Sequence, residues 1–279
     1  MRKLEENIFK ILMIIASALV VGSFFLIVFT IVKKGLPAMN LDMITKTPER
    51  GFYIGKEGGI LNVIIGSLYL ALGSSLLALL VSLPIVIYIN LYLKTGSWLG
   101  SVTRLSYDVL FGIPSIVYGA FGFTIMIYFG LKASLLGGII AVTLLVIPIM
   151  IRTMDEVMRT VPKELLDASY TLGATRLETV KILLRQSAVG ILTAILLSFG
   201  RAIGDAASVM FTAGFSDNIT TSLTDPAPTL PLAIFFQLSS PIEEVQARAY
   251  ASALVLTIIV LLISISARIL TKRFSKNKI

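Results

Sequence analysis

The chain has 279 residues, of which 56% are hydrophobic and 14% charged, and its formal net charge is +8. A mean hydropathy of +0.91 excludes an ordinary soluble domain. Cysteine and histidine are both absent, which excludes disulfides, Cys/His zinc sites, thiol nucleophiles and imidazole proton relays. The composition therefore indicates an integral membrane protein that works without these groups.

Six apolar runs are long enough to cross a bilayer, which requires about 20 residues each. They lie near residues 9–32, 63–93, 107–129, 134–152, 187–213 and 248–270. The runs are too long for barrel strands, and lipid leaves no water to satisfy unpaired backbone groups. Lys33 and Lys34 follow the first run where a signal peptide would have its cleavage site. We therefore predict an all-α integral membrane protein with six transmembrane helices, the first of them a retained anchor.

Basic residues indicate the orientation of these helices. If both termini are cytoplasmic, 16 of the 24 basic residues lie on the inner side and seven on the outer side. This distribution follows the positive-inside rule, although the first hairpin taken alone favours the opposite orientation. We predict a multi-pass protein with both termini in the cytoplasm. The positive charge is then a topology signal, and no nucleic-acid partner is expected.

The predicted organisation has three parts. Residues 1–62 form an N-terminal transmembrane helix and a polar external segment, residues 63–270 a core of five transmembrane helices, and residues 271–279 a basic cytoplasmic tail. Within the third run, small residues recur at three- and four-residue spacing, which predicts a close helix-packing stripe. These residues are Gly112, Ser115, Gly119 and Gly122.

The charged segment 153–186 between two of the runs is longer than a simple connection requires. Its pattern predicts two short helices. Pro162 suits the start of the first, Gly173 supplies a left-handed stop, and Thr175 with Glu178 forms a capping box for the second. We expect a helix–glycine–helix projection on the cytoplasmic side.

This projection resembles the cytoplasmic loop of bacterial ABC importer permeases, whose pattern is E-A-A, three residues, G, nine residues, I-x-L-P. Here 167–169 read Asp-Ala-Ser and Gly173 is in register, whereas Leu183, Arg185 and Gln186 depart from the end of the pattern. The resemblance implies a MetI-like permease core whose coupling helix docks on an ATP-hydrolysing subunit. The residues that it assigns to coupling are Glu164, Asp167, Ala168, Ser169, Gly173, Ala174 and Arg176. The alternative is an amphipathic helix lying on anionic lipid.

Three further blocks resemble phosphate-specific permeases of the PstA type. They are GIPSIVYGAFG at 112–122, GRAIGDAA at 200–207, where that group usually has Glu in place of Asp205, and the segment 230–256 with its SSPIEEVQ core. The resemblance implies import of inorganic phosphate across the cytoplasmic (inner) membrane of a prokaryote. The same architecture could instead carry sulfate, molybdate or tungstate.

Two opposite charges lie inside the fifth run. If this run is one helix, Ser198, Arg201, Asp205, Ser208 and Thr212 share one face. A charge at the bilayer centre costs about 2.5–3.5 kcal/mol on insertion scales, so this face should meet protein or water. Either Arg201 and Asp205 neutralise each other and fix the helix to its neighbours, or they line an anion path in which the guanidinium binds an oxyanion.

No G-x-x-x-x-G-K-[ST] phosphate-binding loop is present in the sequence. We therefore expect a transport subunit and not an enzyme, with no cofactor bound by this chain. The family resemblance implies ATP and Mg on a partner ATPase in two copies, a second related permease chain and an external phosphate-binding protein, all within membrane lipid. A passive channel or an ion-coupled secondary carrier remains the alternative class, and it leaves the cytoplasmic projection unexplained.

Overall fold

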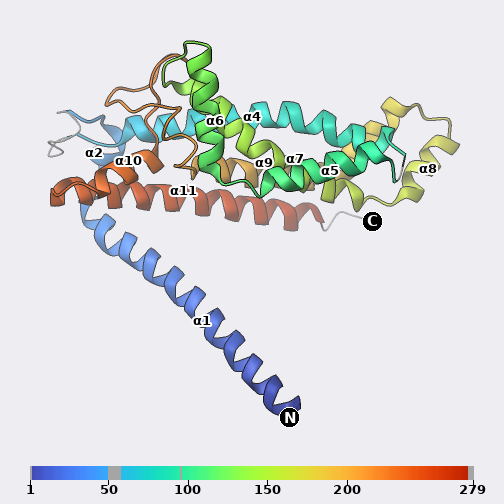
Figure 1. The fold of residues 1–279 in the computed structure, drawn as a ribbon, viewed down its shortest axis with the longest axis horizontal. Helices are drawn as coiled ribbons and strands as arrows, with labels where there is room; N and C mark the ends of the chain where they lie inside the picture. The colour runs from blue at the N-terminus through green and yellow to red at the C-terminus, as the bar shows by residue number, and fades with distance from the viewer. Residues whose placement is uncertain (1, 50–57, 95, 276–279) are drawn as a thin grey trace.

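A computed structural model describes residues 2–49, 58–94 and 96–275, and helices dominate this part of the chain (Figure 1). The α-helices are α1 (Arg2–Gly35), α2 (Leu41–Thr45), α4 (Leu61–Ile87), α5 (Trp98–Phe111), α6 (Ser115–Tyr128), α7 (Leu135–Arg159), α8 (Lys163–Thr171), α9 (Arg176–Ile203), α10 (Leu230–Leu238) and α11 (Glu243–Ser275). A 3-10 turn, η1 (Leu36–Ala38), follows α1, and a π-helical turn, η2 (Tyr88–Tyr92), extends α4. Residues 50–57 of the predicted external segment and 276–279 of the predicted tail lie outside the described residues.

Five of the described helices are each long and apolar enough to cross a membrane, and α5 with α6 would make a sixth span. The prediction of an all-α membrane fold is confirmed, but the third span is not one straight helix. The axes of α5 and α6 differ by 99°. Pro114 explains the break, because proline disfavours helical backbone in the residue before it and here stands at the N-cap of α6. By contrast, Pro84 and Pro148 lie inside continuous helices.

The fourth and fifth runs also have different boundaries from those predicted. Helix α7 continues to Arg159, seven residues beyond the expected end at 152. The second short helix expected in the cytoplasmic loop is the first part of α9, because no break separates residues 176 and 203. Helix α9 then ends at Ile203, with Gly204 as its C-cap, so the run 187–213 is not one helix. Residues 204–229 form turns and irregular backbone.

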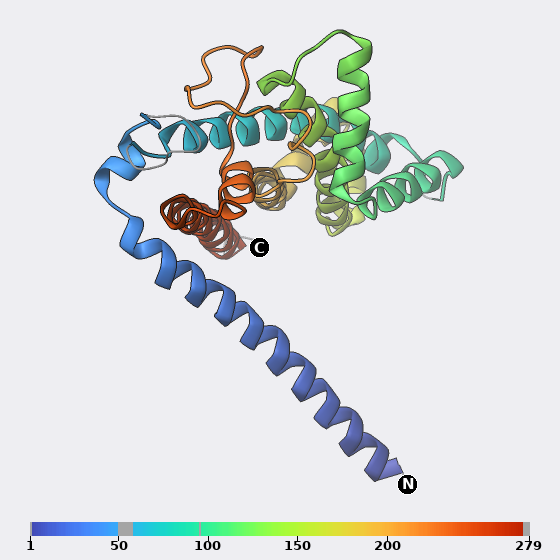
Figure 2. The same ribbon diagram turned by 60° about the vertical axis from the view of Figure 1, so that its left-hand side comes forward.

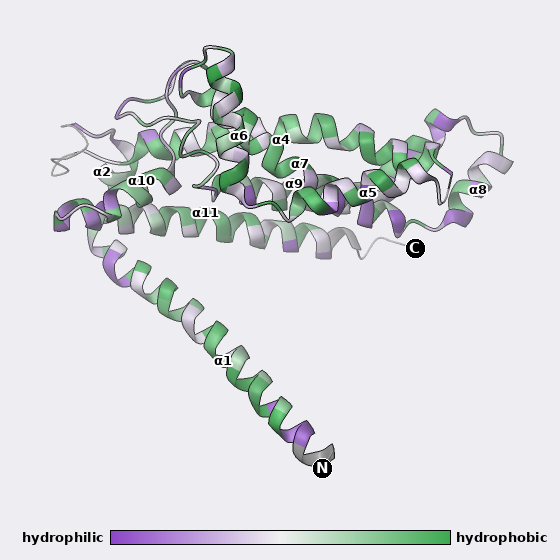
Figure 3. Ribbon diagram, viewed as in Figure 1, coloured by the Kyte–Doolittle hydropathy of each residue, from purple (hydrophilic) through white to green (hydrophobic). Residues whose placement is uncertain are grey.

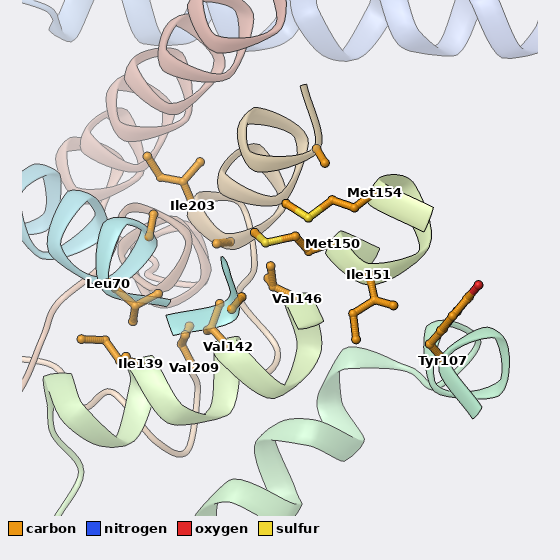
Figure 4. Close-up of a cluster of buried hydrophobic side chains, with 14 of the residues drawn as sticks. Leu70, Tyr107, Ile139, Val142, Val146, Met150, Ile151, Met154, Ile203 and Val209 are labelled. Carbon is orange, nitrogen blue, oxygen red and sulfur yellow. The ribbon is translucent and has the colours of Figure 1, made fainter. Parts of the chain in front are cut away.

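The core is built around α7, against which α4 and α9 pack. One stripe of α7 is buried completely and faces these neighbours (Figure 4). Its fully buried members, spaced four residues apart, are Val142, Val146, Met150 and Met154. Val209, from the irregular segment after α9, reaches the same cluster. The segment 204–229 is therefore part of the packed core.

This segment also supplies partners for the first backbone N–H groups of α7, which no helix can satisfy internally. The amide of Ser134 donates to the Thr212 carbonyl at 2.9 Å, and the amide of Leu135 donates to the Asp225 carbonyl at 2.8 Å. The segment is braced in turn by the Asp225 carboxylate, which accepts from the Thr221 hydroxyl at 2.9 Å. This hydrogen bond and those from the amides of Thr221 and Ser222 hold the pKa of Asp225 below its ordinary value.

The predicted small-residue stripe lies on two elements. Gly112 is the C-cap of α5, whereas Gly119 and Gly122 lie in α6. A Cβ at Gly119 would lie 2.8 Å from the Ser208 Cα, and one at Gly122 would lie 3.0 Å from the Ala141 Cβ. These two glycines therefore let α6 approach the irregular segment and α7 closely, as expected of such a stripe.

Helix α1 diverges from the bundle in both views (Figures 1 and 2). The C-terminal end of α1 meets the N-terminal part of α11. A Cβ on Gly35 would lie 2.6 Å from the Tyr250 carbonyl oxygen. All residues from 5 to 27 are exposed in this chain, and most of this length is apolar (Figure 3). An apolar surface of this extent requires lipid or another polypeptide around it.

Candidate functional site

The helix–glycine–helix projection, predicted on the cytoplasmic side, has the local structure that the sequence predicts. Pro162 is the N-cap of α8, and Gly173 adopts φ +83°, the left-handed conformation that glycine allows. The amide of Thr175 donates to the Glu178 carboxylate at 2.8 Å, while the amide of Glu178 donates back to the Thr175 hydroxyl at 3.4 Å. This capping box starts α9.

The projection has one face against the bundle and one exposed. Ser169 is buried and lies 3.1 Å, oxygen to oxygen, from Thr179 of α9, and Leu166 packs on the core. The exposed side carries large apolar residues, since Leu172 is 88% exposed and Leu177 71% exposed. Of the residues assigned to coupling, Ser169 is buried and Ala174 half-buried, and the others are exposed; these are Glu164, Asp167, Ala168, Gly173 and Arg176.

The Arg201–Asp205 pair exists, but at the end of a helix and not within one. The Arg201 Nη2 lies 3.2 Å from the Asp205 Oδ1, and the two side chains are 44% and 2% exposed. The other Asp205 oxygen accepts from the Ser208 amide at 2.8 Å and from the Ser208 hydroxyl. Asp205 thus caps the turn that follows α9, which fixes its carboxylate beside Arg201.

The predicted polar stripe therefore divides into a buried part and an exposed part. Ser198, Ser208 and Thr212 are fully buried, and the Thr212 hydroxyl donates to the Ser208 carbonyl at 2.9 Å. The guanidinium of Arg201 is the exposed member of the set. It lies in the last turn of α9, where the negative end of the helix dipole favours a cation. Irregular backbone at membrane depth is tolerated only where it is buried in protein or lines water.

A second polar cluster was not found by sequence reasoning. The Asp155 carboxylate, 1% exposed, accepts from the Arg104 Nε at 3.0 Å, the Tyr107 hydroxyl at 2.7 Å and the Asn90 amide at 2.7 Å. The four side chains come from η2, α5 and α7. The sequence placed Asp155 in a loop, although its helical spacing from Ile151 and Met158 could have placed it on the buried side of α7.

No group of three or more His, Cys, Asp or Glu residues in the described part of the chain is arranged to hold a metal ion. The two polar clusters described above consist of guanidinium, carboxylate, hydroxyl and amide groups. Guanidinium groups can bind anions, and the carboxylate, hydroxyl and amide groups exchange hydrogen bonds.

The family match and the individual relatives of this chain agree with each other. Residues 82–278 match the family described as "Binding-protein-dependent transport system inner membrane component". The phosphate transport system permease protein PstA of Yersinia pestis is 37% identical over 260 residues, covering 92% of this chain and 86% of that protein. The protein of the same name from Pasteurella multocida is 34% identical over 282 residues, covering 99% and 97% respectively.

Among solved structures, the fold resembles a chain of the MetNI methionine ABC transporter in an inward-facing conformation. The TM-score is 0.61 at 17% sequence identity, and the alignment covers 77% of this chain and 96% of that chain. At this level of identity the likeness concerns the fold alone.

The buried cluster predicts a stability difference between two aspartates. Asp155→Asn should destabilise the protein by about 3 kcal/mol, because an amide would face the donors of Arg104 and Asn90 and leave the guanidinium without its counter-charge. Thermal unfolding in detergent should show Tm lowered by about 5–10 °C. The matched control is Asp108→Asn, which removes an exposed pair with Arg152 and should cost about 0–1 kcal/mol. Equal shifts in the two variants would contradict this assignment.

Proposed function

Because this chain belongs to the family of binding-protein-dependent transport system inner membrane components, we propose that it is the permease subunit of an ATP-driven importer of inorganic phosphate. The observation that carries the choice of cargo is identity of 34–37% to PstA proteins over at least 92% of the chain. The chain is a multi-pass inner membrane protein and a transport subunit. The resemblance to ABC importer permeases that its motifs suggested is confirmed.

The remaining parts of the machine belong to the proposal. ATP and Mg are bound by a separate ATPase present in two copies, a second related permease completes the membrane unit, and an external phosphate-binding protein delivers the cargo. Helix α8 and the C-terminal end of α11 lie at the same end of the bundle (Figure 1), which suits cytoplasmic termini in a prokaryotic inner membrane. The exposed apolar residues Leu172 and Leu177 on the projection suit docking on the ATPase.

Arg201 is proposed as the anion-binding residue of the transport path. Its side chain is 44% exposed although Ala202, Ile203 and Asp205 beside it are buried. An exposed charge at membrane depth should face water or another chain rather than lipid. Asp205 would neutralise Arg201 in the empty state, so that the anion competes with it and is released again. Since Asp205 is tied to Ser208 by two hydrogen bonds, it would remain in place when the anion binds.

The competing interpretation is that Arg201 and Asp205 only join the end of α9 to the following turn. In that case both residues matter for assembly, and neither contacts cargo. The two interpretations differ in whether loss of the guanidinium affects transport separately from assembly.

The cargo is tested by competition in proteoliposomes that contain the whole complex. We expect ATP-dependent uptake of radioactive phosphate that arsenate inhibits, since arsenate shares the charge and shape of phosphate. The uptake should continue in the presence of an ionophore. Inhibition by sulfate, molybdate or tungstate instead would indicate another oxyanion, and uptake without ATP would indicate a channel or a secondary carrier.

Arg201→Gln should reduce phosphate uptake roughly 10- to 150-fold, because a hydrogen bond to a charged group is worth about 1.5–3 kcal/mol. Membrane abundance and co-purification with the partner subunits should remain near normal. The control is Arg185→Gln, which removes a charge from the exposed cytoplasmic part of the same helix. If Arg201→Gln prevents co-purification to the same degree as it prevents uptake, the structural interpretation is correct.

Coupling through α8 is tested by Gly173→Pro, because proline fixes φ near −65° and Gly173 requires a positive φ. We expect loss of co-purification with the ATPase and loss of coupled ATP hydrolysis. Gly130→Pro is the matched control, since Gly130 also has a positive φ and open space around it but lies far along the chain from the projection. Ala168→Asp places a charge on the same exposed surface without altering the backbone. Unchanged association in both projection variants would remove the coupling role.

A further inference from the structure

A cavity of about 300 Å³ lies beside the projection. Its lining residues come from η2 and the residues after it, the start of α5, the end of α7 and the helices α8 and α9. Its polar lining consists of Asn90, Lys94, Ser97, Arg104, Arg159 and Lys163. The Arg201 site is not part of it. Among the residues that the structure describes, no carboxylate lines this cavity, so its described walls carry positive charge and neutral polar groups.

Three of these basic side chains are exposed and form no ion pair with any described residue. Arg104 is paired with Asp155, whereas Lys94, Arg159 and Lys163 take part in none of the ion pairs formed within residues 2–49, 58–94 and 96–275. Lys94, Arg159 and Lys163 line the same small cavity, and an anion bound between them would offset their mutual repulsion. The cavity therefore has a charge distribution that an anion would neutralise.

Two helix N-termini add to this field. Ser97, the N-cap of α5, and Lys163, the first residue of α8, both line the cavity. The N-cap of α8 is Pro162, which has no side chain able to cap the first amides. A helix N-terminus carries a partial positive charge and presents N–H groups, both of which favour phosphate.

We infer that this cavity binds a phosphate group, held by Lys94, Arg159 and Lys163 and by the amino end of α8. Its volume is at the lower end of the range for small-ligand sites, which suits a small anion with bound water. The source is either free inorganic phosphate on the inner side or the headgroup of an anionic lipid. The bound group would contact both Lys163 of α8 and Lys94 of the bundle, and would therefore hold the projection against the bundle.

The test uses the absence of native cysteine. Leu93→Cys places a single thiol in the cavity lining, on an Arg201→Gln background that removes the proposed transport site. The full chain is held in nanodiscs of neutral phosphatidylcholine, and alkylation by N-ethylmaleimide is followed with and without inorganic phosphate at constant ionic strength. We expect phosphate to slow alkylation severalfold.

Variants that remove charge inside or outside the cavity show whether the protecting phosphate binds there. Lys94→Gln with Lys163→Gln should raise the half-protecting phosphate concentration about 10-fold or more, through loss of charge-assisted contacts. Lys94→Arg with Lys163→Arg should retain protection. Lys181→Gln with Arg185→Gln removes the same charge from the cytoplasmic face outside the cavity, and should change this concentration less than about twofold. Arg159→Gln is an independent variant, expected to weaken protection in the same direction.

The source is found by changing the lipid. Protection by added phosphate in neutral nanodiscs supports free phosphate, and protection only in nanodiscs containing phosphatidylglycerol supports a lipid headgroup. The proposal is overturned if neither slows alkylation, or if the cavity variants and the Lys181/Arg185 control lose protection equally. Circular dichroism and gel filtration verify that every variant is folded. None of these outcomes depends on transport or on a partner ATPase.

Discussion

Helix α7 is held at both ends by polar interactions that lipid cannot supply. At its amino end, carbonyls of the segment 204–229 accept from Ser134 and Leu135, and near its carboxyl end Asp155 accepts from three side chains of η2 and α5. Unsatisfied groups of this kind cost several kcal/mol in a bilayer, so these contacts fix the axial position and rotation of α7. The apolar stripe of α7 can then pack against α4 and α9 in one register.

The contacts that fix α7 at its two ends also connect it to the Arg201–Asp205 pair and to the α8 projection. The segment 204–229 that caps α7 also contains Asp205, so the carboxylate beside Arg201 belongs to the core structure. At the other end, η2 carries Asn90 of the Asp155 cluster, and Tyr92, whose ring lies under the Arg176 guanidinium at 5.4 Å. Helix α8 packs on α9 through Ser169 and Thr179, and Arg176 of α9 contacts η2. A displacement of α8 would therefore act on packed elements and not on a loose loop, as the transmission of a movement requires.

The helix–glycine–helix projection shows which features follow from local sequence rules. Pro162, Gly173 and the Thr175–Glu178 pair each act over three or four residues, and the structure forms the predicted turn and caps. The function proposed for this surface came from a motif resemblance, because the same residues resemble the cytoplasmic loop of ABC importer permeases. By contrast, hydropathy could not separate an apolar run from its polar helical continuation, so the end of α7 and the start of α9 were misplaced. Hydropathy also could not show that the run 187–213 leaves the helix at Gly204 and continues as buried irregular backbone.

The sequence alone determined the membrane class and the helical secondary structure, since these follow from composition and run length. It indicated the family through the resemblance of its motifs to those of known permeases. Only the tertiary structure decided that α5 and α6 form a bent pair, that α9 stops before Asp205, and that Asp155 is buried among residues 48 to 65 positions away in the chain. It also brought Lys94, Arg159 and Lys163 to one cavity. Such arrangements depend on contacts between distant segments, and no periodicity within a single helix encodes them.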